Sequence, residues 1–85
     1  MLFRSRALDH YRSSIAFKES SGNAYGAAIT RYNVAALLLD AGRYPEALEY
    51  AHAALREFEG RGAGGTREAG TIRGLIGEIE RAASA

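Results

Sequence analysis

Apolar residues recur at every third or fourth position through most of the chain, and this spacing constrains the fold more than any other feature. The clearest stripe follows Pro45 and runs through Ala47, Leu48, Ala51, Ala54, Leu55 and Phe58. Such spacing places apolar side chains on one face of an α-helix. No segment shows the alternation of a strand, and Ala, Leu, Glu and Arg, which favour helix, dominate the composition. The sequence therefore predicts an all-α fold.

Four predicted helices form a single domain that spans residues 1–85, and they cover about residues 3–19, 23–41, 45–59 and 66–83. The first helix is indicated by the spacing of Phe3, Ala7, Leu8, Tyr11 and Ile15. Gly22 and Gly42 suit helix ends. Asn23 and Thr66 are expected to cap the helices that follow them. Because the connections are short, we expect neighbouring helices to be antiparallel.

The helices repeat in pairs. The first and third align at an offset of 40, so that Ala7-Leu8 falls on Ala47-Leu48. The second and fourth align at an offset of 41, so that Val34-Ala35 falls on Leu75-Ile76. A period near 40 with two helices in each unit is typical of an α-solenoid.

The middle of the chain carries a family resemblance. The pattern Asn33-Val34-Ala35-x-x-Leu38-x-x-x-Gly42-x-Tyr44-x-x-Ala47-Leu48-x-x-x-x-x-Ala54-Leu55 resembles a tetratricopeptide repeat, and the best match spans residues 23–58. The long period is most similar to the kinesin-light-chain-like bacterial type. The resemblance implies a TPR-like α-solenoid of antiparallel helical hairpins, with its four helices in B-A-B-A phase. It also implies a scaffold that binds a protein or peptide.

In tetratricopeptide repeats the A helices line the concave face, so the resemblance assigns the second and fourth helices to that face. The peptide-binding residues that it implies are Ile29, Tyr32, Asn33, Ala36, Asp40 and Arg73, with Arg81 aligned to Asp40. Asn33 would hold the backbone of a bound peptide, and Tyr32 would supply an aromatic contact. The alternative is that Asn33 caps or bridges neighbouring helices and that Tyr32 packs against one of them, because a helix with two apolar stripes needs cover on both faces.

The remaining motifs do not indicate a catalytic site, a cofactor site or a metal site. Gly60, Gly62 and Gly65 satisfy the dinucleotide pattern G-x-G-x-x-G, but a predicted helix precedes them where that site requires a strand. We therefore interpret residues 60–65 as a flexible loop. His10 and His52 lack the spacing of metal ligands, and no serine lies in a nucleophile elbow. We expect no catalytic residue, no cofactor and no metal, and hence a protein that is not an enzyme.

Charge and hydropathy argue against nucleic-acid and membrane partners. The 11 basic and 10 acidic residues are interspersed and leave a net charge of +1, so no basic footprint for nucleic acid exists. The longest apolar run, residues 34–39, is far shorter than the roughly 18 residues that cross a bilayer. The absence of cysteine is compatible with a reducing compartment, and we expect a cytoplasmic protein.

The B-A-B-A phase leaves the first and last helices without their repeat partners. We therefore expect apolar surface at both ends, covered either by the rest of a longer repeat array or by a second copy in a homo-oligomer. A two-fold dimer would pair the fourth helix with its copy or exchange an element. Gly70 and Gly74 favour close packing of that helix against the third helix or another subunit. Structural self-association, or a regulatory role within a larger multidomain bacterial protein, is the alternative to peptide binding.

Overall fold

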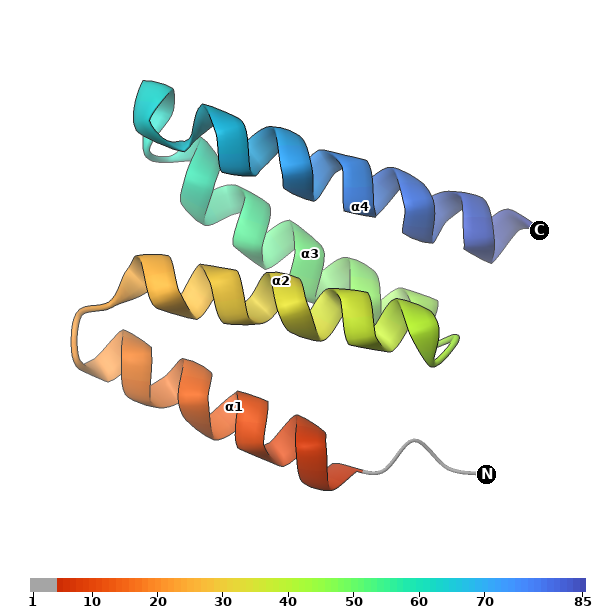
Figure 1. Cartoon of the computed structure of the whole chain (residues 1–85), viewed down its shortest axis with the longest axis horizontal. Coiled ribbons are helices and arrows are strands. Elements are labelled where there is room, and N and C mark those ends of the chain that lie inside the picture. The colour runs from red at the N-terminus through yellow and green to blue at the C-terminus, as the bar shows by residue number, and fades with distance from the viewer. Residues whose placement is uncertain (1–4) are drawn as a thin grey trace.

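The structure, a computed structural model, describes residues 5–85, and all its regular elements are helices (Figure 1). They are α1 (Ser5–Ser20), α2 (Ala24–Asp40), α3 (Tyr44–Glu59), the 3-10 helix η1 (Gly62–Gly65) and α4 (Thr66–Ser84). The predicted all-α fold is confirmed for these residues. Each bound lies within one residue of its prediction, except that the predicted start of the first helix, and with it Phe3, falls outside the described residues.

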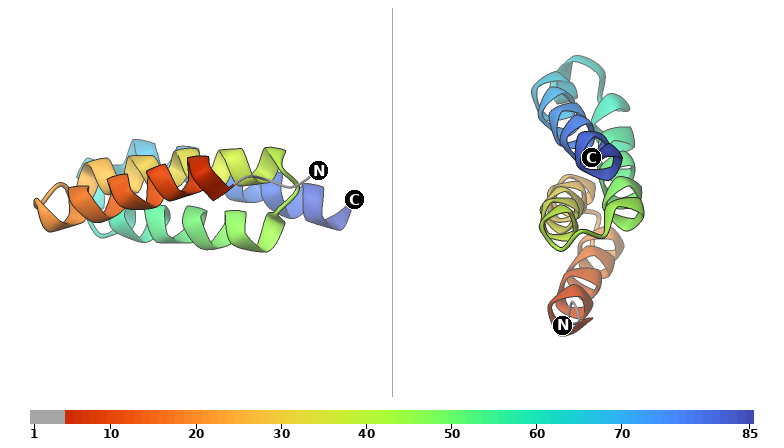
Figure 2. Two further views of the ribbon diagram at one scale, coloured as in Figure 1. Left: turned by 90° about the horizontal axis from the view of Figure 1, so that it is seen from below. Right: turned by 90° about the vertical axis from the view of Figure 1, so that its right-hand side faces the viewer.

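The helices follow one another as an open stack, and successive helices run in opposite directions (Figure 1). Helix α2 packs against α1, α3 and α4, whereas within residues 5–85 the backbone of α1 approaches only that of α2. Seen end-on, α2 and α4 lie on one side and α3 on the other (Figure 2). The extents of 38 × 27 × 13 Å describe a flat molecule, because α1 and α4 never meet to close a bundle.

Two of the three interhelical turns have the same conformation. Gly22 and Gly42 have left-handed φ angles of +81° and +76°. The next residues, Asn23 and Arg43, share a φ of −99° with ψ of 70° and 72°. In each turn the backbone N–H of that next residue donates to a carbonyl five residues earlier, which closes the helix end. The predicted helix ends at Gly22 and Gly42 are therefore confirmed.

The predicted cap at Asn23 is also confirmed, since its side-chain oxygen accepts a hydrogen bond of 2.8 Å from the backbone N–H of Gly26. A side-chain cap satisfies one of the backbone donors that a helix start leaves free. Helix α3 begins differently: its N-cap, Arg43, makes no capping bond with its side chain, and Pro45 lies in the first turn. Proline suits this place because its missing N–H would have no partner within the helix.

The third connection corrects two predictions. Residues 60–65 contain the ordered helix η1 rather than a flexible loop, and Gly65 rather than Thr66 is the N-cap of α4. Because η1 runs directly into α4, Thr66 already has a helical backbone, and its hydroxyl donates back to the Gly62 carbonyl at 3.4 Å. Gly65 lies against the end of α3: a Cβ added there would be 2.9 Å from the carbonyl carbon of Phe58 and closer still to its oxygen.

The core lies between α2, α3 and α4. The first apolar stripe of α2 is fully buried at Ala27, Ala28, Val34, Ala35 and Leu38, and it is met by Ala47, Ala51, Ala54 and Phe58 of α3 and by Ala69, Ile72, Leu75, Ile76 and Ile79 of α4. The small alanines of α2 and α3 let these two helices approach closely. The second apolar stripe of α2 is only half-buried, so α2 is covered on one face and partly open on the other; its members are Ile29, Tyr32, Ala36 and Leu39.

Helix α1 is less buried than α3, its predicted counterpart. Ala7 is exposed whereas Ala47 is fully buried, and only Leu8 and Ile15 of α1 are buried apolar residues. The difference follows from position, since α3 lies between α2 and α4 and α1 has a neighbour on one side only.

The outward face of α4 is polar and that of α1 is polar except for Phe17, so the expected apolar surface at both ends is largely absent from the described chain. Phe17, 71% exposed, and Tyr25, 45% exposed, are the large apolar residues exposed within residues 5–85. Shallow hollows on the two end helices are lined by Arg6, Asp9, His10 and Ser13 of α1 and by Gly77, Glu80, Arg81 and Ser84 of α4. Apart from Phe17, the large apolar side chains of the described parts of α1 and α4 lie on the face that packs against a neighbouring helix.

Gly70 and Gly74 lie on the open side of α4. A Cβ added at either position would meet no atom within 4 Å, so neither glycine permits a close contact with α3. Glycine inside a helix is less favourable than alanine by roughly 1 kcal/mol. We therefore expect Gly70→Ala and Gly74→Ala each to raise the free energy of unfolding by about 1 kcal/mol in urea denaturation. A loss of stability in either variant would show that this face is covered.

Candidate protein-binding face on helix α2

Five of the six residues predicted for peptide binding share the side of α2 opposite its buried stripe. We call these five residues the α2 strip: Ile29, Tyr32, Asn33, Ala36 and Asp40. Their spacing along the helix places them on one face. Asn33 and Asp40 are exposed, and the other three are half-buried. In Figure 1, α2 lies in front of α3, which covers its other side.

The α2 strip is unusual for an exposed helix face because it is nearly uncharged. Helix α2 has two charged residues among its 17, Arg31 and Asp40, and only Asp40 belongs to the strip. Solvated helix faces ordinarily carry many charged side chains. The outward faces of α1 and α4 do so, with Arg6 and Asp9 on one and Glu80 and Arg81 on the other.

The capping or bridging role considered for Asn33 is not seen within residues 5–85. Its side chain is exposed, and its amide has no hydrogen-bond partner within residues 5–85, so it neither caps nor bridges helices there. For Tyr32 the packing role holds in part. Its ring packs against the core but stays half-exposed, and its hydroxyl has no partner among the described residues. The strip therefore combines an apolar floor with unused polar groups.

Arg73 does not join the α2 strip. Its guanidinium pairs with Glu59 of α3 at 2.9 Å. Glu68 marks the side of α4 that faces α2, because its carboxylate accepts a hydrogen bond of 3.3 Å from the Tyr25 hydroxyl. Arg73 lies five residues further on, which turns it about 140° around the helix from Glu68. Arg81 is exposed beside Gly77 and Glu80, with no ion pair in the described chain.

Tyr25 is a member of this face that the sequence reasoning missed. It lies one turn before Ile29, at the same helical spacing, which is the signal that would have found it. Its ring meets Phe58 edge-on with the centroids 5.4 Å apart, and the Arg61 guanidinium lies 5.5 Å from the Tyr25 centroid. These contacts fix an exposed aromatic ring at the start of α2.

A polar cleft lies between α1, α2 and α3, apart from the α2 strip. It has a volume of about 220 Å³ and is lined by Arg12, Arg31, Glu46, Glu49, Tyr50 and Ala53. Arg12 donates to the Tyr50 hydroxyl at 3.4 Å, a bond that raises the pKa of Arg12 above its ordinary value. Arg31 pairs with Glu19, and Glu46 with Arg43. Two of these contacts join helices, since Arg12–Tyr50 links α1 to α3 and Arg31–Glu19 links α2 to α1.

Two further kinds of site can be checked directly in the described residues. Within residues 5–85 no three His, Cys, Asp or Glu side chains gather in a way that could hold a metal ion. Nor does any described helix have the length and apolar character needed to cross a membrane. Fold and site together define an all-α protein of successive helical hairpins with one open, nearly uncharged helix face. Comparison with protein-family models, curated proteins and solved structures gives no match.

Proposed function

We propose that this chain is a tetratricopeptide-type helical-repeat module that binds a segment of another protein through the α2 strip. The observation that carries the proposal is the strip itself: a nearly uncharged outward face with an Asn33 amide that has no partner in the described chain. A scaffold role rather than catalysis is also in keeping with an open face that lacks converging acid, base or nucleophile side chains.

The arrangement of the hairpins supports the repeat assignment. Two turns of the same conformation, at Gly22 and Gly42, reverse the chain at an interval of 20 residues (42 − 22). With the η1 connection that follows α3, these reversals leave α2 and α4 parallel on one side of the stack, with α3 on the other (Figures 1 and 2). Alternate helices on alternate sides are the arrangement that the B-A-B-A phase requires.

The chemistry of the strip favours an extended segment with apolar side chains. The Asn33 amide offers both donors and an acceptor, which match the C=O and N–H of a peptide backbone. Ile29, Ala36 and the Tyr32 ring offer apolar surface on either side of it. Asp40 is exposed and has no ion pair within residues 5–85, so it favours a basic residue at that end of the ligand.

Selection of binding peptides from a random library displayed on phage would test the proposal. We expect enriched peptides to lose about tenfold or more in affinity for Asn33→Ala, because their backbone would lose a buried hydrogen bond worth ~1.5 kcal/mol. Ile29→Glu should abolish binding, since it puts a charge on the apolar floor.

The matched control is His52→Ala, which alters an exposed side chain of α3 and should leave affinity unchanged. Circular dichroism would show that all three variants keep their helices. If no peptide is enriched, or if the enriched peptides bind Asn33→Ala and Ile29→Glu as tightly as the unmodified chain, then the strip is not a binding face.

Self-association through the helix ends has less support than peptide binding. It rests on apolar surface left open at both ends, and within the described chain the outward faces of α1 and α4 offer mainly polar side chains, with Phe17 of α1 as the large apolar exception. Pairing of α4 with its copy would bury mainly glycine and charged side chains, which supply little hydrophobic stabilisation.

A further inference from the structure

Helix α1 is attached to the rest of the described chain by few contacts. Of its buried apolar residues, only Leu8 belongs to the main core cluster. Ile15 is buried outside that cluster, as is Ala27 of α2. By comparison, α3 and α4 contribute four and five buried residues to the main cluster. Helix α1 therefore contributes one buried residue, Leu8, and the half-buried Tyr11 to the main cluster, which is less than α3 or α4 contributes.

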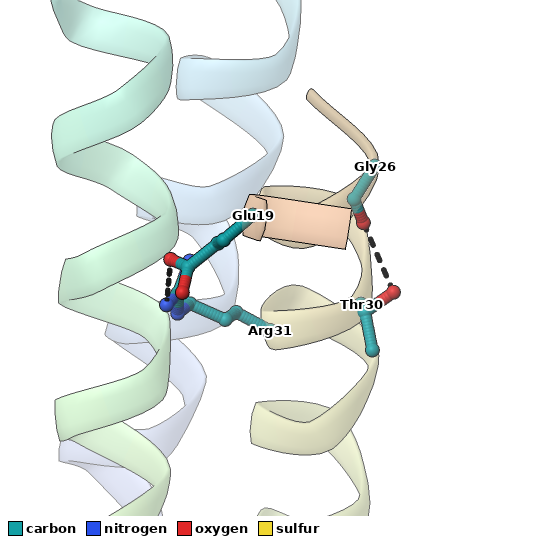
Figure 3. Close-up of polar contacts among 4 residues, drawn as sticks. All are labelled: Glu19, Gly26, Thr30 and Arg31. Atoms are coloured by element: carbon teal, nitrogen blue, oxygen red, sulfur yellow. Dashed lines mark hydrogen bonds and ion pairs between the residues drawn. The ribbon is translucent and has the colours of Figure 1, made fainter. Parts of the chain in front are cut away.

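Polar contacts at the C-terminal end of α1 give the α1–α2 interface its specificity. Lys18 donates from Nζ to the Thr30 hydroxyl at 2.8 Å, and that hydroxyl in turn donates to the Gly26 carbonyl at 2.9 Å. One residue further on, Glu19 pairs with Arg31 of α2 (Figure 3). The bonds of Lys18 and Glu19 connect α1 to α2, whereas the Thr30–Gly26 bond lies within α2.

We call the surface of α2 that receives α1 the α1 seat, defined by Ala27, Thr30 and Arg31. Ala27 and Thr30 are buried, at 0% and 5% exposure. Departure of α1 would remove Leu8 from the main cluster but leave the cluster members of α2, α3 and α4 in contact with one another. Helix α1 is thus the element whose separation disturbs the fold least.

The turn that connects α1 to α2 depends on one residue. Only Ser21, Gly22 and Asn23 separate the two helices, and the reversal requires the left-handed φ of +81° at Gly22. A residue other than glycine is disfavoured in this conformation by about 1–2 kcal/mol. If the turn opens, the chain can continue from α1 into α2 without reversing.

We propose that α1 exchanges between copies of this chain, so that the α1 seat of one copy accepts α1 of a second copy in a domain-swapped dimer. A second copy is the occupant because its α1 carries the groups that bond to the seat: Lys18 for Thr30 and Glu19 for Arg31. The swapped dimer re-forms each of these contacts, and it differs from the closed chain mainly at the turn.

Replacing Gly22 by alanine tests the proposal. Alanine disfavours the reversed turn and favours a continuous helix, and both effects act in each of the two chains. We expect the dimer dissociation constant, measured by sedimentation velocity over a range of concentrations, to fall at least about tenfold. A Gly22→Ala chain that stays as monomeric as the unmodified chain overturns the proposal.

Gly42→Ala is the matched control. Gly42 has an equivalent φ of +76°, and a Cβ at either glycine would meet nothing within 4 Å. Opening that turn would separate α2 from α3 and break the main core cluster, so this variant should lose thermal stability without gaining dimer. Equal dimerisation of both variants would contradict a specific exchange of α1.

A double variant adds a second check. Adding Ile15→Asp to Gly22→Ala should restore the monomer, because α1 must occupy the α1 seat of the second copy in the dimer. A dimer that persists in the double variant would use some other surface and would contradict the proposal.

Hydrogen exchange on the unmodified chain provides a test that needs no variant. The amides of α1 should exchange through an opening of lower free energy than those of α3, because α1 separates without disturbing the core. Equal protection of α1 and α3 would show that the helices open only together, and it would overturn the proposal even if Gly22→Ala failed to fold.

Discussion

Replacing Gly65 by alanine is expected to destabilise the protein by about 3 kcal/mol or more. The added Cβ would lie 2.9 Å from the carbonyl carbon and 3.1 Å from the Cα of Phe58. These are backbone atoms at the end of α3, so no rotation of a side chain can relieve the contact. The α3–η1–α4 connection would have to open, and α4 would lose its alignment with the core. Urea denaturation followed by circular dichroism measures the effect.

Gly64→Ala is the control for this prediction. Gly64 precedes Gly65 within η1, but a Cβ added there would meet nothing within 4 Å. We expect its stability to stay within about 0.5 kcal/mol of the unmodified chain, as for most surface substitutions. If Gly64→Ala and Gly65→Ala had similar effects, the result would reflect the loss of glycine from η1 in general and would contradict the close approach to Phe58.

Truncation of Phe58 to alanine is expected to cost about 3–5 kcal/mol of stability. Phe58 is fully buried, and three features depend on it. Its ring meets Tyr25 edge-on, it lies 5.9 Å from the Arg61 guanidinium, and its backbone supports Gly65. Loss of the ring would therefore leave a cavity and also loosen the start of α2 against α3 and η1. Thermal denaturation would report the change as a lower midpoint.

Phe17→Ala is a control of identical chemistry. Phe17 lies on α1 with 71% of its surface exposed, so its truncation removes little buried area. We expect a change within about 0.5 kcal/mol. A large loss at Phe17 would mean that this side chain is covered, for example by a second copy of the chain. A small loss at Phe58 would contradict the position of the core at the α2–α3–η1 junction.

The helices and two of the turns follow from local sequence. Apolar spacing locates each helix, and Gly22 and Gly42 mark their turns because only glycine readily adopts the left-handed backbone that both have. The third connection could not be derived in this way. At the end of η1, Gly65 packs on the backbone of Phe58, seven residues earlier, and no local sequence pattern indicates that contact.

The polar helix ends were predictable in principle. Arg6, His10, Ser13 and Phe17 lie at helical spacing on the outward face of α1, and three of these four are polar. The expectation of apolar ends came from the repeat phase, which assumes that every helix has two packed faces. The residues of α1 contradict that assumption directly, because its buried apolar residues, Leu8 and Ile15, serve one face.

The positions of candidate site residues within α2 could be predicted from the sequence, but the position of a residue on α4 relative to α2 could not. Helical spacing alone places Ile29, Asn33 and Asp40 on one face of α2. Arg73 was assigned by alignment of α4 with α2, which takes no account of the ion pair with Glu59. The rotation of α4 is fixed by η1 and by the buried contacts of α4, and these involve residues far apart in the sequence.

The measurement that most directly tests binding through the α2 strip is a chemical-shift map of the ¹⁵N-labelled chain. It would be titrated with a peptide selected for binding. We predict the largest shifts at the backbone amides of residues 29–40, together with the side-chain amide of Asn33. Shifts confined to the outward faces of α1 or α3, with residues 29–40 unchanged, would contradict the proposal that this module binds its partner through the open face of α2.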